Sequence, residues 1–357
     1  MKKLILFSMF CACATVMDAQ QIWYVEPIGT GNGSSWNSTV DLTTAVAQAN
    51  SNDEIWVKEG DYHEWLSIPS NVKIYGGFGG TETSVSQRNP LLHETKLNAG
   101  SSVIAHPLRH IVSFYGVNNC LLDGFTIDGG GSIHTTGGGV FSSDAANIVL
   151  KNLKIRSCVG LEGGGAYIHS SSVWMENVIF ENNYAVDVGG GLVISVCDDV
   201  TLANVLFFHN DTIPYDDSTI TFTKRGGGFY VEMSTPVFYN LTVSDNNAMT
   251  NMGSGGYFDH STGVFYNSVI YNDTIVLGVN ASVTYYNCLL WKVTSSTPGS
   301  ANFCSNPMFD PDLHLGQGSP CIDAGNNNYV PLSVTFDLDL NPRINGNSVD
   351  IGAYEFY

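Results

Sequence analysis

Short glycine clusters recur along the middle of the sequence. Triplets begin at Gly137, Gly163, Gly189 and Gly226, and the cluster Ser254-Gly255-Gly256 follows. Successive clusters begin 26, 26, 37 and 28 residues apart. A repeat of about 20 to 50 residues is typical of chains in which one structural unit stacks on the next. Such a stack can hold all 357 residues in one body.

A second repeat lies between the glycine clusters, in fixed phase with them. It is a short apolar segment centred on asparagine, as in Leu150-Lys151-Asn152-Leu153-Lys154-Ile155. The central asparagines are Asn152, Asn177, Asn204, Asn240, Asn267 and Asn287. Strands of about four to six residues without a helical pattern between them predict a β-helix.

The two repeats have a mechanical explanation in such a coil. Corners need backbone with positive φ, which glycine adopts freely and asparagine tolerates well. Stacked asparagines would lie about 4.8 Å apart and could hydrogen-bond as a ladder. Alternation along each strand predicts two inward apolar files. The first is Leu153, Val178, Val205 and Leu241, and the second is Ile155, Phe180, Phe207 and Val243.

Composition excludes several other classes of protein. Glycine is abundant, at 38 residues, and charged residues are only 13%, which argues against a helical bundle. Lys plus Arg number 14 against 33 Asp plus Glu, a net charge of -19. So few cations cannot neutralise a phosphate backbone, so we expect no nucleic-acid partner and no binding to anionic membranes.

The N-terminus has the layout of a secretory signal. Lys2 and Lys3 precede an apolar run over residues 4–16, and Ala19 offers a small residue for cleavage. We therefore expect residues 1–19 to be removed and the protein to be secreted or held at the cell surface. No later stretch is long enough to span a membrane. Cys11 or Cys13 could carry a lipid anchor, although the usual aliphatic residue three places earlier is missing.

Six cysteines follow the signal, an even number that permits disulfides in an exported protein. Cys304 with Cys321 is the preferred pair, since both lie in a loop-rich end segment. Cys288 occupies a strand position that is apolar in other repeats, which favours a buried free thiol. No cysteine or histidine spacing suggests zinc, and we expect no metal site.

Several segments resemble known families. The residues after the triplets, with Phe180-Glu181-Asn182-Asn183 and Phe207-Phe208-His209-Asn210, are similar to the GGA and FxxN repeats of polymorphic outer membrane proteins. The chain also resembles right-handed parallel β-helix proteins of the pectin-lyase-like superfamily, especially secreted ones from Bacteroidetes. Residues 23–100 and the ending Val349-Asp350-Ile351-Gly352-Ala353-Tyr354-Glu355 resemble their two ends. The resemblance implies the fold but no single chemistry, because the superfamily includes lyases, hydrolases, epimerases and proteins without known activity.

The expected fold is all-β, a single right-handed parallel β-helix with a short N-terminal capping helix and an irregular C-terminal cap. The expected organisation is a signal peptide (1–19), an N-terminal cap with the first coils (20–109), the β-helix repeats (110–301) and a C-terminal capping segment (302–357). Asp41 would cap the helix. For the acidic and basic residues of the ending we favour buried ion pairing over catalysis; these are Asp323, Arg343, Asp350 and Glu355.

The strand after each triplet suggests a binding face. If the residue after the triplet points inward, the next residues point outward, namely Phe141, Tyr167, Val193, Tyr230 and Phe258. Two residues further on, the same face would carry Ser143, His169, Ser195, Glu232 and His260. Aromatic rings beside hydrogen-bonding groups suit sugars, so the predicted binding residues are Tyr167, His169, Tyr230, Phe258 and His260. The alternative is a structural ladder covered by the C-terminal segment.

The resemblance also defines what an enzyme would need. Lyases of this superfamily use a basic residue and a cation that neutralises the substrate carboxylate. Lys224-Arg225 ends the one long insertion, so Lys224, Arg225 and Glu232 are the candidate catalytic residues, with a solvated surface hairpin as the alternative. The hydrolase pattern fails, because Asp198-Asp199 lacks its companion motifs. Asp337-Leu338-Asp339 starts like a calcium loop, but Pro342 replaces its glycine; no cofactor is expected, with calcium as a minor alternative.

Three functions therefore stay open. The first is a secreted or cell-surface protein that binds a polysaccharide or surface glycan without complete catalytic machinery. The second is a polysaccharide lyase-like enzyme acting on an acidic polysaccharide. The third is a structural or adhesive surface solenoid. The sequence leaves open the glycan, the oligomeric state and whether the protein is an enzyme.

Overall fold

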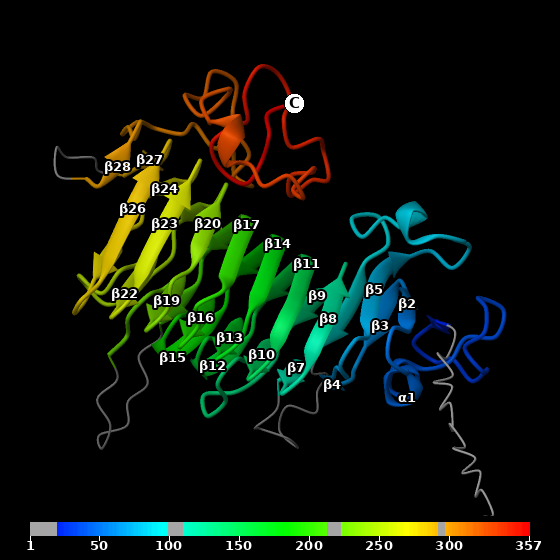
Figure 1. The fold of residues 1–357 in the computed structure, drawn as a ribbon. Coiled ribbons are helices and arrows are strands. Elements are labelled where there is room, and N and C mark those ends of the chain that lie inside the picture. The colour runs from blue at the N-terminus through cyan, green and yellow to red at the C-terminus, as the bar shows by residue number, and fades with distance from the viewer. Residues whose placement is uncertain (1–19, 99–109, 213–222, 292–296) are drawn as a thin grey trace, which may run out of the picture.

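The chain forms an elongated stack of parallel strands (Figure 1). The computed structural model describes residues 20–98, 110–212, 223–291 and 297–357. The predicted signal peptide, at 1–19, lies outside these ranges. The long insertion is also mostly outside them, because residues 213–222 are not described.

The stack contains three parallel sheets, two of them long and the third confined to its middle coils. Sheet A contains β1 (Ile22–Val25), β2 (Glu54–Lys58), β3 (Gly60–Tyr62), β5 (Lys73–Phe78), β6 (Thr95–Asn98), β8 (Asn118–Asp123), β9 (Thr126–Asp128), β11 (Ala146–Arg156), β14 (Val173–Glu181), β17 (Val200–Phe208), β20 (Val237–Tyr239), β21 (Thr242–Ser244), β23 (Thr262–Tyr266), β24 (Val269–Tyr271), β26 (Ser282–Tyr286), β27 (Leu289–Leu290) and β28 (Gly299–Ser300). Sheet B contains β4 (Leu66–Ser67), β7 (Val112–Tyr115), β10 (Val140–Ser143), β13 (Ala166–His169), β16 (Leu192–Ser195), β19 (Phe229–Glu232), β22 (Gly256–Asp259) and β25 (Ile275–Leu277). Sheet C contains β12 (Val159–Glu162), β15 (Tyr184–Val188) and β18 (Asp211–Thr212).

One coil passes through the three sheets in turn. After β10 the chain turns at Asp144, bends inside β11 at Asn152, and turns again at Ser157 and Gly163, all with positive φ between 50° and 62°. The glycine triplet is needed because neighbouring coils approach closely there. A Cβ added at Gly164 would lie 2.2 Å from the carbonyl oxygen of the next coil.

The predicted asparagine ladder is present on the outside of sheet A. Asn177 Nδ2 donates to Asn152 Oδ1 at 3.2 Å, and Asn204 Nδ2 donates to Asn177 Oδ1 at 2.9 Å. The six asparagines named in the sequence analysis all have positive φ, and we call this row the outer ladder. Asp123 is its first member, since its carboxylate accepts from Asn152 Nδ2.

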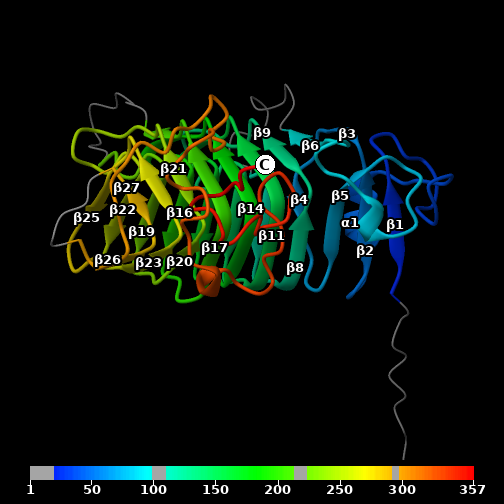
Figure 2. The ribbon, with the colours of Figure 1, turned by 90° about the horizontal axis from the view of Figure 1, so that it is seen from above.

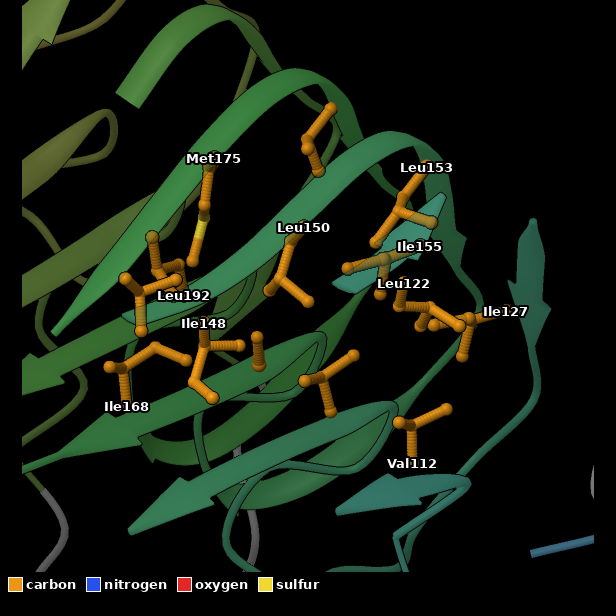
Figure 3. Packing of buried hydrophobic residues seen from close by; sticks show 14 of the residues in the cluster. Val112, Leu122, Ile127, Ile148, Leu150, Leu153, Ile155, Ile168, Met175 and Leu192 are labelled. Atoms are coloured by element: carbon orange, nitrogen blue, oxygen red, sulfur yellow. The ribbon is translucent and has the colours of Figure 1, made fainter. Parts of the chain in front are cut away.

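The interior is a column of apolar side chains, as predicted (Figure 3). Both predicted inward files are buried, and Phe180 stacks on Phe207 with ring centroids 4.9 Å apart. The asparagine of each FxxN segment also points inward, which the sequence did not tell us. Asn183 Nδ2 donates to Asn210 Oδ1, and Asn210 Nδ2 to Asn246 Oδ1, both at 2.9 Å. We call this buried row, which ends at Asp273, the inner ladder.

The first part of the chain confirms the predicted helix. Helix α1 (Leu42–Gln48) is the one α-helix in the described ranges, and two short 3₁₀ turns, η1 (Val85–Gln87) and η3 (Asn327–Tyr329), accompany it. Asp41 caps α1 by accepting a hydrogen bond from the Thr44 amide at 2.8 Å. The helix contacts β1, β2 and β4 near the N-terminal end of the stack (Figure 2).

The C-terminal segment, residues 302–357, is irregular and folds back over the outer face of sheet A (Figure 1). Its buried ion pairing is as predicted: Arg343 bonds Glu355 at 2.8 Å with both side chains out of contact with solvent. Asp350 accepts from the main-chain amides of Asp323 and Phe356. Burial raises the pKa of Glu355 to about 7, against the opposing effect of Arg343.

The predicted disulfide between Cys304 and Cys321 is wrong. Both are free thiols, as are the other four cysteines outside the first 19 residues. Cys321 is buried in an apolar cluster between the C-terminal segment, to which it belongs, and sheet A, whereas Cys304 is exposed. Cys288 is a buried free thiol, as predicted, and burial raises its pKa to about 12.

Candidate functional site

The outer face of sheet B carries two rows of side chains in register. We call the first the outward file; its members, paired strand to strand, are Phe141, Tyr167, Val193, Tyr230 and Tyr257. We call the second the polar row; its members are Ser143, His169, Ser195, Glu232 and Asp259. Four coils follow the predicted pattern, and the fifth departs from it.

The predictions that Phe258 faces outward and that His260 joins the polar row are wrong. Gly256 pairs with Phe229, so the fifth cluster is shifted by one residue relative to the other four. A Cβ at Gly256 would lie 2.4 Å from the ring of Phe229, so this inward position is filled by the neighbouring coil's ring. Phe258 therefore points into the core, at 0% exposure, and His260 lies beyond the strand.

The outward file is less open than predicted. Tyr230 and Tyr257 stack at 5.8 Å between centroids and are only 6% and 8% exposed. Phe141 and Tyr167 also stack, at 6.1 Å and 6° between planes. Rings stacked along the coil axis cover each other's faces, so few faces are left for a sugar. Burial raises the pKa of Tyr230, and the charges of neighbouring carboxylates add to this effect. The C-terminal segment is not the cover, because it lies on sheet A.

Arg225 is engaged with the protein's own groups. Its guanidinium lies 4.8 Å from the centroid of the Tyr257 ring and 3.4 Å from a carboxylate oxygen of Asp259. Lys224 precedes it with φ of 53°, and within the described ranges it has no carboxylate within 4.0 Å. Glu232 accepts a hydrogen bond from Ser195 Oγ at 3.3 Å. Glu232 thus lies in β19, whereas Arg225 bridges Val188 of sheet C and is partly neutralised by Asp259; within the described ranges no contact brings Lys224 to Glu232.

Two further carboxylates border this face, and sequence reasoning missed them. Burial raises the pKa of Glu162, and the charges of Asp187 and Glu232 raise it further. Asp187 accepts from the amide and hydroxyl of Thr223, at 2.6 and 2.8 Å. A signal was present in the sequence, because Glu162 and Arg225 each stand directly before a glycine triplet.

His169 completes the site. Its ring lies 6.2 Å from that of Tyr167, and its Nδ1 atom is buried without a hydrogen-bond partner in the described part of the chain. The polar row therefore offers one hydrogen-bonding side chain per coil, which is a hydroxyl, an imidazole or a carboxylate.

The described ranges contain no cluster of three or more histidine, cysteine or acidic residues arranged to hold a metal ion. In the calcium-like segment, Asp337 accepts from the amides of Asp339, Asn341 and Glu355, so its oxygens organise the turn. Calcium binding at this segment stays a prediction.

These features define a parallel β-helix protein with one polar, acidic face on sheet B. The family described as "Right handed beta helix region" matches residues 110–290, and the chain belongs to this family. The predicted fold class, a single right-handed parallel β-helix, is thereby confirmed.

Solved structures show similar architecture. Pectate lyase Pel9A has 14% identity over 94% of this chain and 96% of that chain, with a TM-score of 0.45. Pectin methylesterase from Aspergillus niger has 14% identity over 87% and 96%, with a TM-score of 0.42. PfbA, a surface adhesin of Streptococcus pneumoniae, has 11% identity over 79% and 78%, with a TM-score of 0.34. At these values the similarities say nothing about activity.

A search of curated protein sequences found no match. Among the described residues, no helix combines the length and the apolar character that a membrane crossing requires.

Proposed function

We propose that this protein is a secreted or cell-surface β-helix protein that binds a neutral glycan along the outer face of sheet B. The observation that carries the proposal is the polar row. His169, Ser195, Glu232 and Asp259 occupy one register position in four successive coils. Coils repeat about every 4.8 Å, so a linear polymer lying along the axis meets one hydrogen-bonding side chain per coil.

The charge of this face favours a neutral polymer over an acidic one. Glu162, Asp187, Glu232 and Asp259 surround it, and Arg225 already pairs with Asp259. A uronic-acid polymer would place its carboxylates beside these charges, at a cost that low dielectric increases. The lyase alternative needs a cation free to neutralise the substrate. Arg225 is a poor candidate because it is already paired with Asp259, which leaves that role to Lys224.

Glu162 and Glu232 give a second candidate, glycoside hydrolysis. An acid with a raised pKa beside a second carboxylate is the arrangement by which glycosidases divide the roles of proton donor and base. A reducing-sugar assay with any polysaccharide that binds would test this candidate. Release of sugar that is lost in Glu162→Gln would support it.

The binding proposal is tested by affinity electrophoresis of the full chain in gels containing neutral or uronic-acid polysaccharides. We expect retardation by at least one neutral polymer, and a weakening of about 5- to 30-fold in Glu232→Gln or His169→Ala, the loss expected for one or two hydrogen bonds. Glu181→Gln is the matched control, because this residue lies in β14 of sheet A. No retardation by any polymer, or equal retardation of all variants, would reject the proposal.

A further inference from the structure

The outer ladder binds main-chain groups of this same chain. Asn204 Nδ2 donates to the carbonyl oxygen of Phe336 at 2.7 Å, and Asn240 Nδ2 donates to a carbonyl of the C-terminal segment at 3.2 Å. Asn267 binds both polar groups of Asn326, donating to its carbonyl at 3.1 Å and accepting from its amide at 2.9 Å. In three successive coils, the ladder therefore holds a polypeptide by its backbone.

Nearer the N-terminus, within the described ranges, the same ladder binds no main-chain group; Asn152 is partly exposed there and Asn177 is 3% exposed. Asn152 Nδ2 donates to Asp123, and Asn177 Nδ2 donates to Asn152, so each amide uses one hydrogen along the ladder. Within the described ranges the second hydrogen of either amide has no acceptor. Two adjoining cavities of about 290 and 500 Å³ lie over this stretch, and Asn152, Asn177, Pro90 and Leu340 line both.

The walls of this groove come from two distant parts of the chain. Pro90 and Leu91 belong to the loop after β5, and Leu338 and Leu340 belong to the C-terminal segment. Figure 1 shows that this loop and this segment rise on the same side of sheet A. Leu91, at the rim, is 62% exposed, so the groove presents aliphatic surface to solvent.

The cations of the groove are paired. Arg88 bonds Asp123, Lys151 bonds Glu176 at 2.6 Å, and Lys154 has a carboxylate partner at 2.7 Å. Glu94 also lines the first cavity, accepts a hydrogen bond from Thr126 Oγ1 at 2.8 Å and has no cation within 4.0 Å in the described ranges, so the groove is at most weakly acidic. The second amide hydrogens of Asn152 and Asn177 and the aliphatic walls are its recognition elements.

We propose that this groove binds an extended, apolar peptide segment of a partner protein, in the way that the ladder binds the C-terminal segment. Main-chain carbonyls of the peptide accept hydrogen bonds from Asn152 and Asn177, and alternate side chains pack against Leu91 and Leu340. The groove continues an interface that already recognises peptide groups, which favours a peptide over a glycan. The site lies on sheet A and is independent of the function proposed for sheet B.

The test uses a fluorescein-labelled peptide with the sequence of residues 333–342, the stretch that the chain itself lays over Asn204, carrying Asp337→Asn and Asp339→Asn so that the peptide has no acidic side chain. Fluorescence anisotropy with the full chain should show saturable binding. Leu91→Glu should weaken it at least about 10-fold, because a charge would enter the aliphatic wall. Leu92→Glu is the matched control, since Leu92 is 70% exposed and lines neither cavity, and it should stay within about 2-fold of the parent.

A second pair of variants tests the amide. Asn152→Gly keeps the positive φ and removes the side chain, and we expect binding to fall about 5- to 10-fold. Asn287→Gly makes the same change outside the groove and should leave binding unchanged. Glu232→Gln should also bind the peptide normally, which separates this proposal from the glycan site. No saturable binding, equal losses in both members of a pair, or displacement of the peptide by a neutral oligosaccharide would overturn the proposal.

Discussion

Asp273 ends the inner ladder with a carboxylate where the preceding coils have an amide. One oxygen accepts from the Asn246 amide nitrogens, Nδ2 at 2.8 Å and the main-chain N at 3.2 Å. The other oxygen is buried without a donor in the described part of the chain, and the residue is only 2% exposed. Burial raises the pKa of Asp273 from 3.8 to about 6.

This shift predicts that Asp273→Asn stabilises the protein at neutral pH. The folded carboxyl holds its proton more tightly than the unfolded one, so its contribution to stability is full below pH 3.8 and is lost as pH rises through about 6. A shift of about two units corresponds to about 3 kcal/mol, at about 1.36 kcal/mol per unit. An asparagine at position 273 avoids this cost. Its amide also supplies an N–H donor, the group with which Asn246 in the preceding coil binds the carbonyl of Phe207.

Urea unfolding followed by tryptophan fluorescence measures this effect. We expect Asp273→Asn to be more stable than the parent by up to about 3 kcal/mol at pH 7.5, with the difference smaller by about 1.4 kcal/mol at pH 5.0. Comparison at each pH cancels the other titrating groups. Asp198→Asn, an exposed carboxylate, is the control and should change stability by less than about 0.5 kcal/mol. A difference of equal size at both pH values would refute the reasoning.

Three further substitutions test the packing. Arg343→Ala leaves Glu355 buried without its cation, so thermal unfolding should show a loss of stability of about 3 to 5 kcal/mol. The loss should be greater at pH 8 than at pH 6, because Glu355 has a raised pKa and its protonation at the lower pH removes the buried charge. An equal loss at both pH values would contradict this. Gly164→Ala places a Cβ against backbone oxygens of the neighbouring coils and should lower the free energy of unfolding in urea by about 3 kcal/mol. Gly116→Ala is the control: a Cβ there meets nothing within 4 Å, and only the positive φ should cost about 1 kcal/mol. Equal losses would mean that the close approach of the coils at Gly164 is not the cause. Phe207→Ala opens a cavity beside Phe180 and should cost about 3 to 5 kcal/mol by the same measurement, and a cost below about 1 kcal/mol would mean that the column collapses to fill the space.

The sequence predicts the coil well, because the features that repeat in it are backbone requirements. Gly163 and Asn152 stand at positive φ, and the file containing Val178 is buried, as expected. The error at Phe258 has a physical cause. Counting from the fifth glycine cluster ignores that the ring of Phe229 occupies the space of a side chain at Gly256.

Other features depend on contacts between coils, which spacing does not encode. The outward position of Tyr230 is predicted, but its burial depends on stacking against Tyr257. The carboxylate neighbours of Glu232 come from the short strands β12 and β15 of sheet C, which the glycine and asparagine repeats do not predict. The prediction that Cys304 pairs with Cys321 failed because Cys321 faces inward and packs against Val269 and Leu289 of sheet A, whereas Cys304 is exposed to solvent.

The clasp of the C-terminal segment on Asn204, Asn240 and Asn267 has a mechanical consequence. Coils of a solenoid touch only their immediate neighbours, so a stretched solenoid can peel off one turn at a time from either end. Here the C-terminal segment crosses back over three coils and is hydrogen-bonded to each of them. A force applied at the C-terminus must first break the hydrogen bonds between the C-terminal segment and these coils, and only then can the coils beneath it unfold.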